Sequence, residues 1–415
     1  MKCTIMLGEK IRKLRKQKKL TLEQLAGSEL TKGMLSLIEN NKAKPSMESL
    51  EYIASRLGVA ISDLMGETSI QETRELLEKA EALINLDFEN NKDKFKELIM
   101  LIEPYTPKLS HGYESARLLD IYSRSLFHEQ KSGWKELVQQ VSTMYDEMNL
   151  TARRASIGIF NALEKFYEHR YSESLAIFIN ERKEVEAKHA FIDPMTRLDF
   201  DYYEAILYFA VGNADAASKV IENALSYSKE KRIFYLIDEL YRIAAAHSMM
   251  SNDKEKTDYF LTKLKQYGEF VEDFKPLFFY KLFKLMSLTF EQHKYGLALE
   301  LINEYSEDFA LVEQFGPWLY IEKGKALYGL GHYQEAIENI EKSEIPHYIH
   351  HPFDLSIFYI KHAYKALAYL ALEDHSKALL TAETAVTLFE PLPDSSFKQF
   401  SNEVYNKIVE TQKKA

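Results

Sequence analysis

Apolar residues recur every three or four positions along most of the chain, which is the spacing of helices with one buried face. Near the amino terminus, Leu7, Ile11 and Leu14 follow this spacing while lysines and arginines occupy the remaining positions. Only 15 Gly and 10 Pro interrupt the 415 residues, and 46% of the residues are hydrophobic. The pattern predicts a globular, all-α protein.

The first helices are short and closely spaced. Thr21 and Gln24 form a predicted capping box, in which each side chain satisfies a free backbone amide at the start of a second helix. The next helix start signal is Thr31, and only four residues, including Gly27, lie between it and Ala26. Two short helices joined by so tight a connection are typical of a helix-turn-helix.

The third helix is predicted from Lys32 to Asn40. Leu35 and Ile38 face inward, and Asn41 follows at a position that favours a left-handed residue. The stretch SMESLEYIASRLGVAISDLM then supplies two closing helices, which makes five in this region. The outer face of the third helix carries small and polar residues, as in proteins that place this helix in the major groove. Its residues are Lys32, Gly33, Ser36 and Leu37.

This region resembles the lambda-repressor-like (Xre/Cro) helix-turn-helix family. The residues that carry the resemblance are IRKLRKQKKLTLEQLA, TKGMLSLIENN and PSMESLEYIASRLGV, which cover nearly all of residues 7–66. The resemblance implies a buried ion pair between Arg15 and Glu39 that locks the first helix to the third. The alternative is a small helical bundle without a role in DNA binding.

The same resemblance assigns positions to the two kinds of DNA contact. Gly33 and Leu37 replace the longer polar side chains common in the family, so base recognition is expected to depend on Lys32 with guanine and on Leu37 against a thymine methyl group. The expected base contacts are Lys32, Gly33, Ser36 and Leu37, and the expected phosphate contacts are Thr21, Thr31, Asn40, Lys42 and Lys44.

Charge separates this region from the remainder of the chain. Residues 1–66 contain 12 Lys/Arg and 7 Asp/Glu, which gives a net charge of +5, whereas the whole chain carries −10. A basic first region on an acidic chain favours two partners of different chemistry, with nucleic acid as the first.

A second pattern begins after residue 70. Eight segments share one layout, in which a polar turn precedes an aromatic residue or its substitute at the start of a helix, and successive segments lie 37 to 43 residues apart. Such a period predicts stacked helix pairs, each supported by its neighbours. A last amphipathic helix, residues 395–414, is expected to cap the array. The starting residues are Phe95, Trp134, Tyr171, Ala214, Lys254, Tyr295, Tyr333 and His375.

These units resemble tetratricopeptide repeats (TPR), most clearly in WLYIEKGKALYGLGHYQEAIENIEKS, where Gly324, Tyr333 and Ala336 match the signature. Because the standard repeat is about 34 residues long, the wider spacing implies lengthened helices. We therefore predict a five-helix DNA-binding domain over residues 1–66, followed over residues 67–415 by a degenerate TPR-like α-solenoid of about eight helix pairs.

A solenoid of helix pairs presents a concave surface formed by the first helix of each pair. Aromatic, acidic, basic and amide side chains are predicted there, a mixture that suits a short extended peptide. The alternative is that the aromatic residues are ordinary repeat packing and the charges a solvated face. The predicted peptide-binding residues are Tyr122, Asn161, Asp199, Tyr202, Glu239, Arg242, Tyr280, Trp318, Lys325 and Tyr328.

Other patterns do not indicate catalysis or a cofactor. PHYIHHP brings together His347, His350 and His351, but it lacks a cysteine and we do not expect a metal site there. No phosphate-binding loop, nucleophile elbow or zinc-protease motif occurs, so no enzymatic activity and no cofactor are expected. The single cysteine, Cys3, and the absence of a signal peptide or membrane-spanning segment lead us to expect a cytoplasmic protein.

A helix-turn-helix domain joined to a long degenerate TPR array resembles the RRNPP family (the Rap, Rgg, NprR, PlcR and PrgX group) of peptide-pheromone-sensing regulators, and is nearest its NprR and PlcR branch. The resemblance implies a homodimer on a pseudo-palindromic operator, with a signalling peptide on the concave face that switches DNA binding. One alternative is that the repeats bind or dephosphorylate a response regulator, alone or as a second role. Another is a constitutive dimeric repressor without a peptide ligand.

Overall fold

The chain is helical throughout the part that the structure describes. The computed structural model describes residues 7–61, 64, 69–86, 91–307 and 309–414, and none of these residues forms a strand. Within these ranges, no helix combines the length and apolar character needed to cross a membrane. The expected all-α fold is confirmed.

The chain divides into two compact units, residues 1–154 and residues 155–415. The first contains the amino-terminal helices together with the first repeats, and the second contains the later repeats. The division falls within α10 (Thr151–Tyr167) rather than near residue 66. This division reflects which residues contact one another and does not test the boundary of the DNA-binding domain predicted at residue 66, which stays a prediction.

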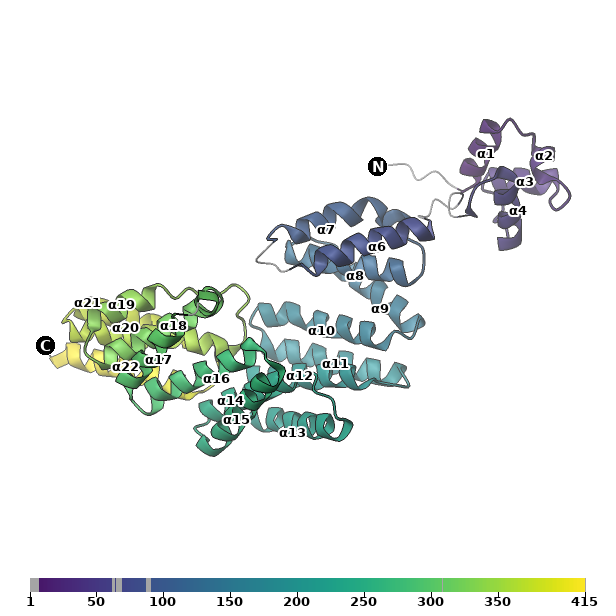
Figure 1. Cartoon of the computed structure of the whole chain (residues 1–415). Helices are drawn as coiled ribbons and strands as arrows, with labels where there is room; N and C mark the ends of the chain where they lie inside the picture. Colours follow the sequence, from purple (N-terminus) through teal and green to yellow (C-terminus); the bar gives the residue numbers. More distant parts are fainter. Residues whose placement is uncertain (1–6, 62–63, 65–68, 87–90, 308, 415) are drawn as a thin grey trace. The chain divides into compact units, whose positions relative to one another are not determined.

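The amino-terminal helices follow the predicted order (Figure 1). Thr21 and Gln24 form the predicted capping box, and the Thr31 hydroxyl accepts from Met34 N to begin the third helix. Asn41 has the expected left-handed backbone, with φ 58°. The predicted fifth helix lies at the end of the stretch that closes at residue 65, and its residues 62, 63 and 65 are outside the described residues. The helices are α1 (Leu7–Gln17), α2 (Leu22–Ala26), α3 (Lys32–Glu39) and α4 (Met47–Leu57).

These four helices enclose one apolar core, in which Ile11, Leu25 and Leu35 are completely buried. Helix α1 approaches the end of α3 very closely, because a Cβ atom at Gly8 would lie 2.1 Å from the Ile38 carbonyl oxygen. The Gly8 backbone N–H donates to Asn41 Oδ1 at 2.9 Å. The close approach of Gly8 to Ile38 and its hydrogen bond to Asn41 therefore hold the end of α3 against the start of α1.

The predicted ion pair between the first and third helices is present. Arg15 donates from Nε to Glu39 Oε1 at 2.6 Å and from Nη2 to Glu39 Oε2 at 2.8 Å. A third donor, Nη1, bonds to the Leu20 carbonyl oxygen at 2.8 Å. Because only 3% of the Glu39 side chain is exposed, its charge depends on Arg15 for compensation.

The remaining helices alternate as first and second members of pairs (Figure 1). A 3₁₀ helix, η1 (Glu103–Lys108), follows α7, and a π-helical turn, η2 (Ser287–Glu291), extends α16. After α10, the first members are α12 (Pro194–Ala210), α14 (Ile237–Met250), α16 (Phe274–Met286), α18 (Phe309–Gly329) and α20 (Pro352–Ala371). The second members are α11 (Tyr171–Lys188), α13 (Ala214–Lys231), α15 (Lys254–Val271), α17 (Tyr295–Tyr305), α19 (Tyr333–Glu341) and α21 (His375–Phe389). The earlier helices are α6 (Ile70–Ile84), α7 (Lys94–Ile102), α8 (Tyr113–His128) and α9 (Trp134–Glu147), and the last helix is α22 (Ser396–Lys414).

The predicted starts of the second helices are confirmed. Every one of these helices begins at its predicted residue, apart from α7, which begins one residue before Phe95. In the second unit, each start is preceded two positions earlier by a residue with positive φ, which reverses the chain in a short turn. These residues are His169, Gly212, Asn252, His293, Gly331 and Glu373.

The TPR signature in α18 and α19 has a direct packing explanation. A Cβ atom at Gly324 would lie 2.4 Å from Ile340 Cγ1 and 3.1 Å from the Ala336 carbonyl oxygen. Ala336 is itself fully buried. The small residues at both positions let the two helices of this pair approach closely.

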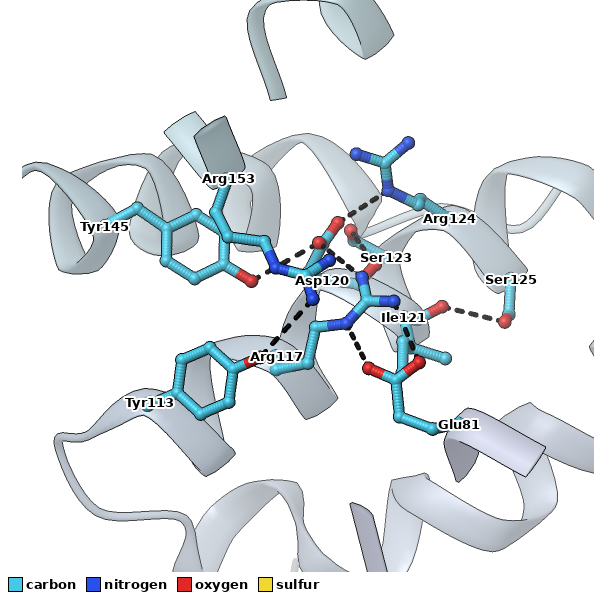
Figure 2. A network of polar contacts seen from close by, with 10 residues as sticks. All are labelled: Glu81, Tyr113, Arg117, Asp120, Ile121, Ser123, Arg124, Ser125, Tyr145 and Arg153. Atoms are coloured by element: carbon cyan, nitrogen blue, oxygen red, sulfur yellow. Dashed lines mark hydrogen bonds and ion pairs between the residues drawn. The ribbon is translucent and has the colours of Figure 1, made fainter. Parts of the chain in front are cut away.

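In the first unit, a polar network joins three repeat helices (Figure 2). Arg117 of α8 donates from Nε to Glu81 Oε1 of α6 at 2.6 Å and from Nη1 to Asp120 Oδ2 at 2.9 Å. Asp120 also accepts from Arg124 Nε at 2.6 Å and from the Tyr145 hydroxyl of α9 at 3.3 Å. Since Asp120 is 1% exposed, nearly all of its hydrogen bonding is to protein.

Candidate functional site

The outer face of α3 is open to solvent. Lys32, Gly33 and Leu37 are exposed and Ser36 is half-buried, as the sequence pattern predicts. Leu37 and Met34 are each 45% exposed, so this short helix presents two apolar side chains to solvent. Met34 was not among the predicted contacts, although its position beside Gly33 placed it at the edge of the same face.

The predicted phosphate-binding hydroxyls already act as helix caps. Thr21 accepts from Gln24 N at 3.0 Å and Thr31 accepts from Met34 N at 3.1 Å. Because a hydroxyl has both a donor and acceptors, each O–H remains able to donate to a phosphate oxygen. Asn40 uses one amide hydrogen on the Ser36 carbonyl oxygen at 2.8 Å and keeps the other.

The lysines near α3 differ in their surroundings. Lys32 Nζ lies 2.7 Å from Glu23 Oε1 of α2, and the hydrogen bond from Lys32 lowers the pKa of Glu23. Lys42 and Lys44 are exposed and form no ion pair within the described part of the chain. Lys32 must therefore exchange Glu23 for a base to make its predicted contact, whereas Lys42 and Lys44 can meet a phosphate directly.

In the second unit, three of the predicted peptide-binding residues form one cluster. Arg242 Nε donates to Glu239 Oε2 at 2.7 Å on α14, and the Tyr202 hydroxyl of α12 donates to the same oxygen at 3.4 Å. Lys275 of α16 donates to Glu239 Oε1 at 2.6 Å. Burial opposes ionisation of Glu239, but Arg242 and Lys275 together lower its pKa to about 2. The cluster therefore contains charged groups at neutral pH.

Two other predicted residues have partners outside this cluster. Asn161 of α10 is half-buried and donates from Nδ2 to Glu181 Oε1 of α11 at 2.6 Å. Asp199 of α12 accepts from the Tyr235 hydroxyl at 2.7 Å, and burial raises the pKa of its carboxyl group. Tyr280 and Tyr328 are half-buried. The structure does not gather these four residues into the cluster.

Three predicted peptide-binding residues require correction because they are buried. Trp318 is 4% exposed and packs edge-on against Phe358 in the core of the second unit. Lys325 is 1% exposed and pairs with the fully buried Glu322 at 2.8 Å. Tyr122 is 9% exposed and belongs to the core of the first unit. Their positions on the helices turn them toward neighbouring helices, so none offers a surface to a ligand.

The sequence interpretation missed a role for the connection between α19 and α20. We call residues 347–351 the histidine segment. The Tyr171 hydroxyl of α11 donates to the His350 carbonyl oxygen at 2.7 Å, and the His350 ring lies 4.6 Å from the Tyr167 ring of α10. No group of three metal-binding side chains occurs among the described residues. The histidine segment thus packs on helices that precede it by about 180 positions in the sequence.

His351 fixes one end of the histidine segment through both ring nitrogens. Its Nδ1 accepts from Phe353 N at 3.2 Å and caps α20, so Nε2 carries the hydrogen and faces the Ile206 carbonyl oxygen of α12 at 3.3 Å. Burial lowers the pKa of His351, the neighbouring Arg242 lowers it further, and Asp354 acts in the opposite direction. The neutral ring is the form that satisfies both contacts.

We expect this arrangement to lose stability in acid. A histidine whose pKa is lowered by folding contributes stability that is present above its unfolded pKa of about 6.5 and is lost as the pH falls through the folded value. His351→Asn keeps a cap acceptor, cannot titrate and loses the bond to α12. Urea unfolding should show it about 1 kcal/mol less stable than the wild type near neutral pH, with a smaller deficit at about pH 5. A deficit independent of pH would contradict the expectation.

The amino-terminal region is similar in sequence to known proteins. Residues 8–69 match the model of a family described as a helix-turn-helix domain. The immunity repressor protein of Bacillus phage phi105 is 37% identical over 65 residues, which are 15% of this chain and 45% of that protein. The chain therefore spans about half the length of this curated relative.

Two solved structures extend the similarity beyond this region. Bacillus thuringiensis PlcR, in complex with the peptide PapR7 and DNA, is 17% identical with a TM-score of 0.31, and the match covers 64% of this chain and 98% of PlcR. Rgg2, an SHP pheromone receptor of Streptococcus dysgalactiae, is 18% identical with a TM-score of 0.31, covering 66% of this chain and 98% of Rgg2. Residues 8–69 are thus similar to helix-turn-helix domains.

Proposed function

We propose that this protein is a cytoplasmic transcriptional regulator that binds operator DNA through residues 8–69 and is switched by a short signalling peptide bound to its helical repeats. The observation that carries the DNA-binding half is the helix-turn-helix domain, whose α3 has an exposed, uncovered outer face. A helix presented in this way can enter the major groove. The net positive charge of this region favours the approach to phosphates.

The proposed contacts divide into two kinds. Lys32, Ser36 and Leu37, together with Gly33, face base edges, and the predicted phosphate contacts surround them. Thr21 and Thr31 keep a free hydroxyl hydrogen, and Lys42 and Lys44 keep a free charge among the described residues. Because base contacts determine specificity and phosphate contacts determine affinity, the two groups of side chains should respond differently to substitution.

We expect DNA binding to weaken steeply as the salt concentration rises, because lysines displace counterions from DNA. Lys44→Ala should weaken binding to all sequences and lower the salt slope by about one, whereas Lys32→Ala should relax specificity by about 1 to 3 kcal/mol at one base pair. The measurement is a mobility-shift titration of the full-length protein against a duplex selected from a random pool and against random DNA.

A matched control removes the same charge elsewhere. Lys79 is exposed on α6, outside the helix-turn-helix domain, so Lys79→Ala should leave both the affinity and the salt slope unchanged. Binding that is equal for selected and random duplexes and insensitive to salt would contradict the assignment of α3 as a reading helix.

The peptide-binding half of the proposal rests on the helical repeats and on the charged cluster of Tyr202, Glu239 and Arg242. An extended peptide has backbone donors and acceptors that need partners, and these side chains supply both kinds. The RRNPP resemblance adds the expectation of a homodimer whose two helix-turn-helix domains bind a pseudo-palindromic site. A ligand that binds one arrangement of such a dimer more tightly shifts the population toward it.

The test of this half is whether a peptide changes operator affinity. Synthetic peptides of about five to ten residues, taken from a small exported reading frame beside the gene, would be titrated into the complex of full-length protein and selected duplex. A change in affinity supports the proposal. If no peptide binds, or if binding leaves operator affinity unchanged, a constitutive repressor or a protein that acts on a response regulator explains the repeats better.

A further inference from the structure

The second unit contains a partly enclosed cavity of about 400 Å³. Its walls are mainly apolar and come from four of the helices that begin repeat pairs. Phe166 lies on α10, Ile206 and Phe209 on α12, Met250 on α14 and Phe353 on α20. This volume lies within the range of roughly 300 to 1,000 Å³ that is common for small-ligand pockets. It is too small for a whole peptide of the proposed length.

One side of the cavity is formed by the histidine segment, through Tyr348, His350 and His351. The hydrogen bonds from Tyr171 to His350 and between His351 and Ile206 hold this side in place. The cavity therefore lies between helices α10, α12 and α14 and a connection that is remote from them in sequence. The shape of the cavity therefore depends on these long-range hydrogen bonds, which are present in the structure without a ligand.

Two charged side chains in the cavity retain capacity for a ligand. Arg242 donates from Nε to Glu239 and also interacts with the Tyr202 hydroxyl. Because a guanidinium has more N–H donors than these two partners accept, Arg242 retains donors for a ligand in the cavity. Asp354, in the first turn of α20, accepts no hydrogen bond from the side chains or backbone of the described residues. The cavity thus offers donors on Arg242 and acceptors on Asp354 beside an apolar chamber.

The balance of charge indicates a neutral ligand. Glu239 is shared by Arg242 and Lys275, and Asp354 supplies a second negative charge that interacts with Arg242, so these two cations and two anions compensate one another. The lining also contains Asp394, which is exposed and lies 3.7 Å from Lys398 Nζ, so its charge is compensated as well. An added ion would disturb this balance, whereas a peptide unit carries a donor N–H and an acceptor C=O without net charge. An apolar side chain attached to that unit would fill the chamber, and its transfer out of water would favour binding.

We propose that this cavity is the anchor pocket for one apolar residue of the signalling peptide, whose N–H donates to Asp354 and whose C=O accepts from Arg242. This inference rests on the peptide-binding half of the proposed function. The pocket selects a leucine-like or phenylalanine-like residue, and the rest of the peptide lies outside it. The histidine segment contacts the anchor residue and couples its presence to the start of α20.

The probe for this pocket is a single blocked residue, N-acetyl-L-leucine N-methylamide, which has one apolar side chain between two peptide units. Saturation-transfer NMR on the full-length protein should detect binding of this probe and no binding of N-acetyl-L-serine N-methylamide. Asp354→Asn weakens the acceptor, and Ala246→Leu fills the cavity from α14. Each should raise the dissociation constant of the leucine probe at least about fivefold.

The matched control is Asp215→Asn. Asp215 is an exposed acid in the first turn of α13, so it shares the charge and the helix position of Asp354 but does not line the cavity. It should leave probe binding unchanged. Circular dichroism separates a local effect from misfolding, and Asp354→Asn provides the test if Ala246→Leu does not fold.

The outcomes distinguish this inference from the proposed function. The inference is overturned if the leucine probe does not bind, if both cavity variants bind it as the wild type does, or if a peptide shifts operator affinity equally in the wild type and in Asp354→Asn. The proposed function survives the last of these results. If the probe binds as expected but no peptide affects operator binding, the proposed function fails, and the cavity belongs to a small apolar ligand instead.

Discussion

Replacing Glu39 by alanine should unfold the helix-turn-helix domain and abolish operator binding, while the repeats remain folded. The substitution leaves the Arg15 guanidinium facing the interior without the carboxylate that accepts two of its hydrogen bonds at 2.6 and 2.8 Å. Removing one partner of a buried ion pair costs about 3 to 5 kcal/mol. Natural domains are stable by only about 5 to 15 kcal/mol, so most of the stability of this small domain would be lost.

Hydrogen exchange on the full-length protein, resolved by peptide, would measure this effect. Amides of α1, α3 and α4 should exchange at least about a hundredfold faster in Glu39→Ala, while those of α12 to α21 keep their protection. The control is Glu51→Ala on α4, which removes the same negative charge from an exposed site. Protection of α1 and α3 in Glu39→Ala equal to that in Glu51→Ala would show that the ion pair contributes little.

The parts of the fold that sequence predicted well depend on local signals. Thr21, Thr31 and Asn41 determine where helices begin and end through contacts with residues a few positions away, and the structure reproduces all three. The second helices of the repeats were found for the same reason, because a short turn with a left-handed residue precedes each start in the second unit. Local chemistry of this kind is readable from one sequence.

The candidate peptide site was predicted less well, because membership of a concave face depends on helical phase. A shift of one residue turns a side chain by about 100° around a helix, enough to move it from a surface into the core. Lys325 shows the difficulty, since a lysine was expected at the surface and the structure buries it beside Glu322. Arg242 and Glu239 were predicted separately as peptide-binding residues, and neither their ion pair with each other nor the shared partner Lys275 was predicted.

The histidine segment could not have been assigned its contacts from sequence. His350 meets Tyr171 and His169 across 179 and 181 positions, and neither partner has a local signal that points to the other. The pattern PHYIHHP indicated only a polar connection with three imidazoles. Its packing against α10, α11 and α12, and the cavity beside it, result from the stacking of several repeats.

The polar network of α6, α8 and α9 gives the second large expected effect (Figure 2). Asp120→Asn should destabilise the first repeats by about 3 to 5 kcal/mol. The carboxylate accepts from Arg117 at 2.9 Å and from Arg124 at 2.6 Å, and an amide in its place removes the charge and turns an NH₂ group toward donors. Asp120 is 1% exposed, so water cannot replace the lost interactions without opening the helices.

Tyr145→Phe provides the matched control within the same network. It removes only the 3.3 Å hydrogen bond from the Tyr145 hydroxyl to Asp120 and keeps the ring, so it should cost about 1 kcal/mol. Urea unfolding combined with hydrogen exchange of α6, α8 and α9 would measure both variants. A cost of Asp120→Asn no larger than that of Tyr145→Phe would mean that Arg117 remains satisfied by Glu81, with which it forms bonds of 2.6 and 3.1 Å. In that case Glu81, rather than Asp120, would be the acid that holds α8 to α6, and Glu81→Gln should then show the larger loss.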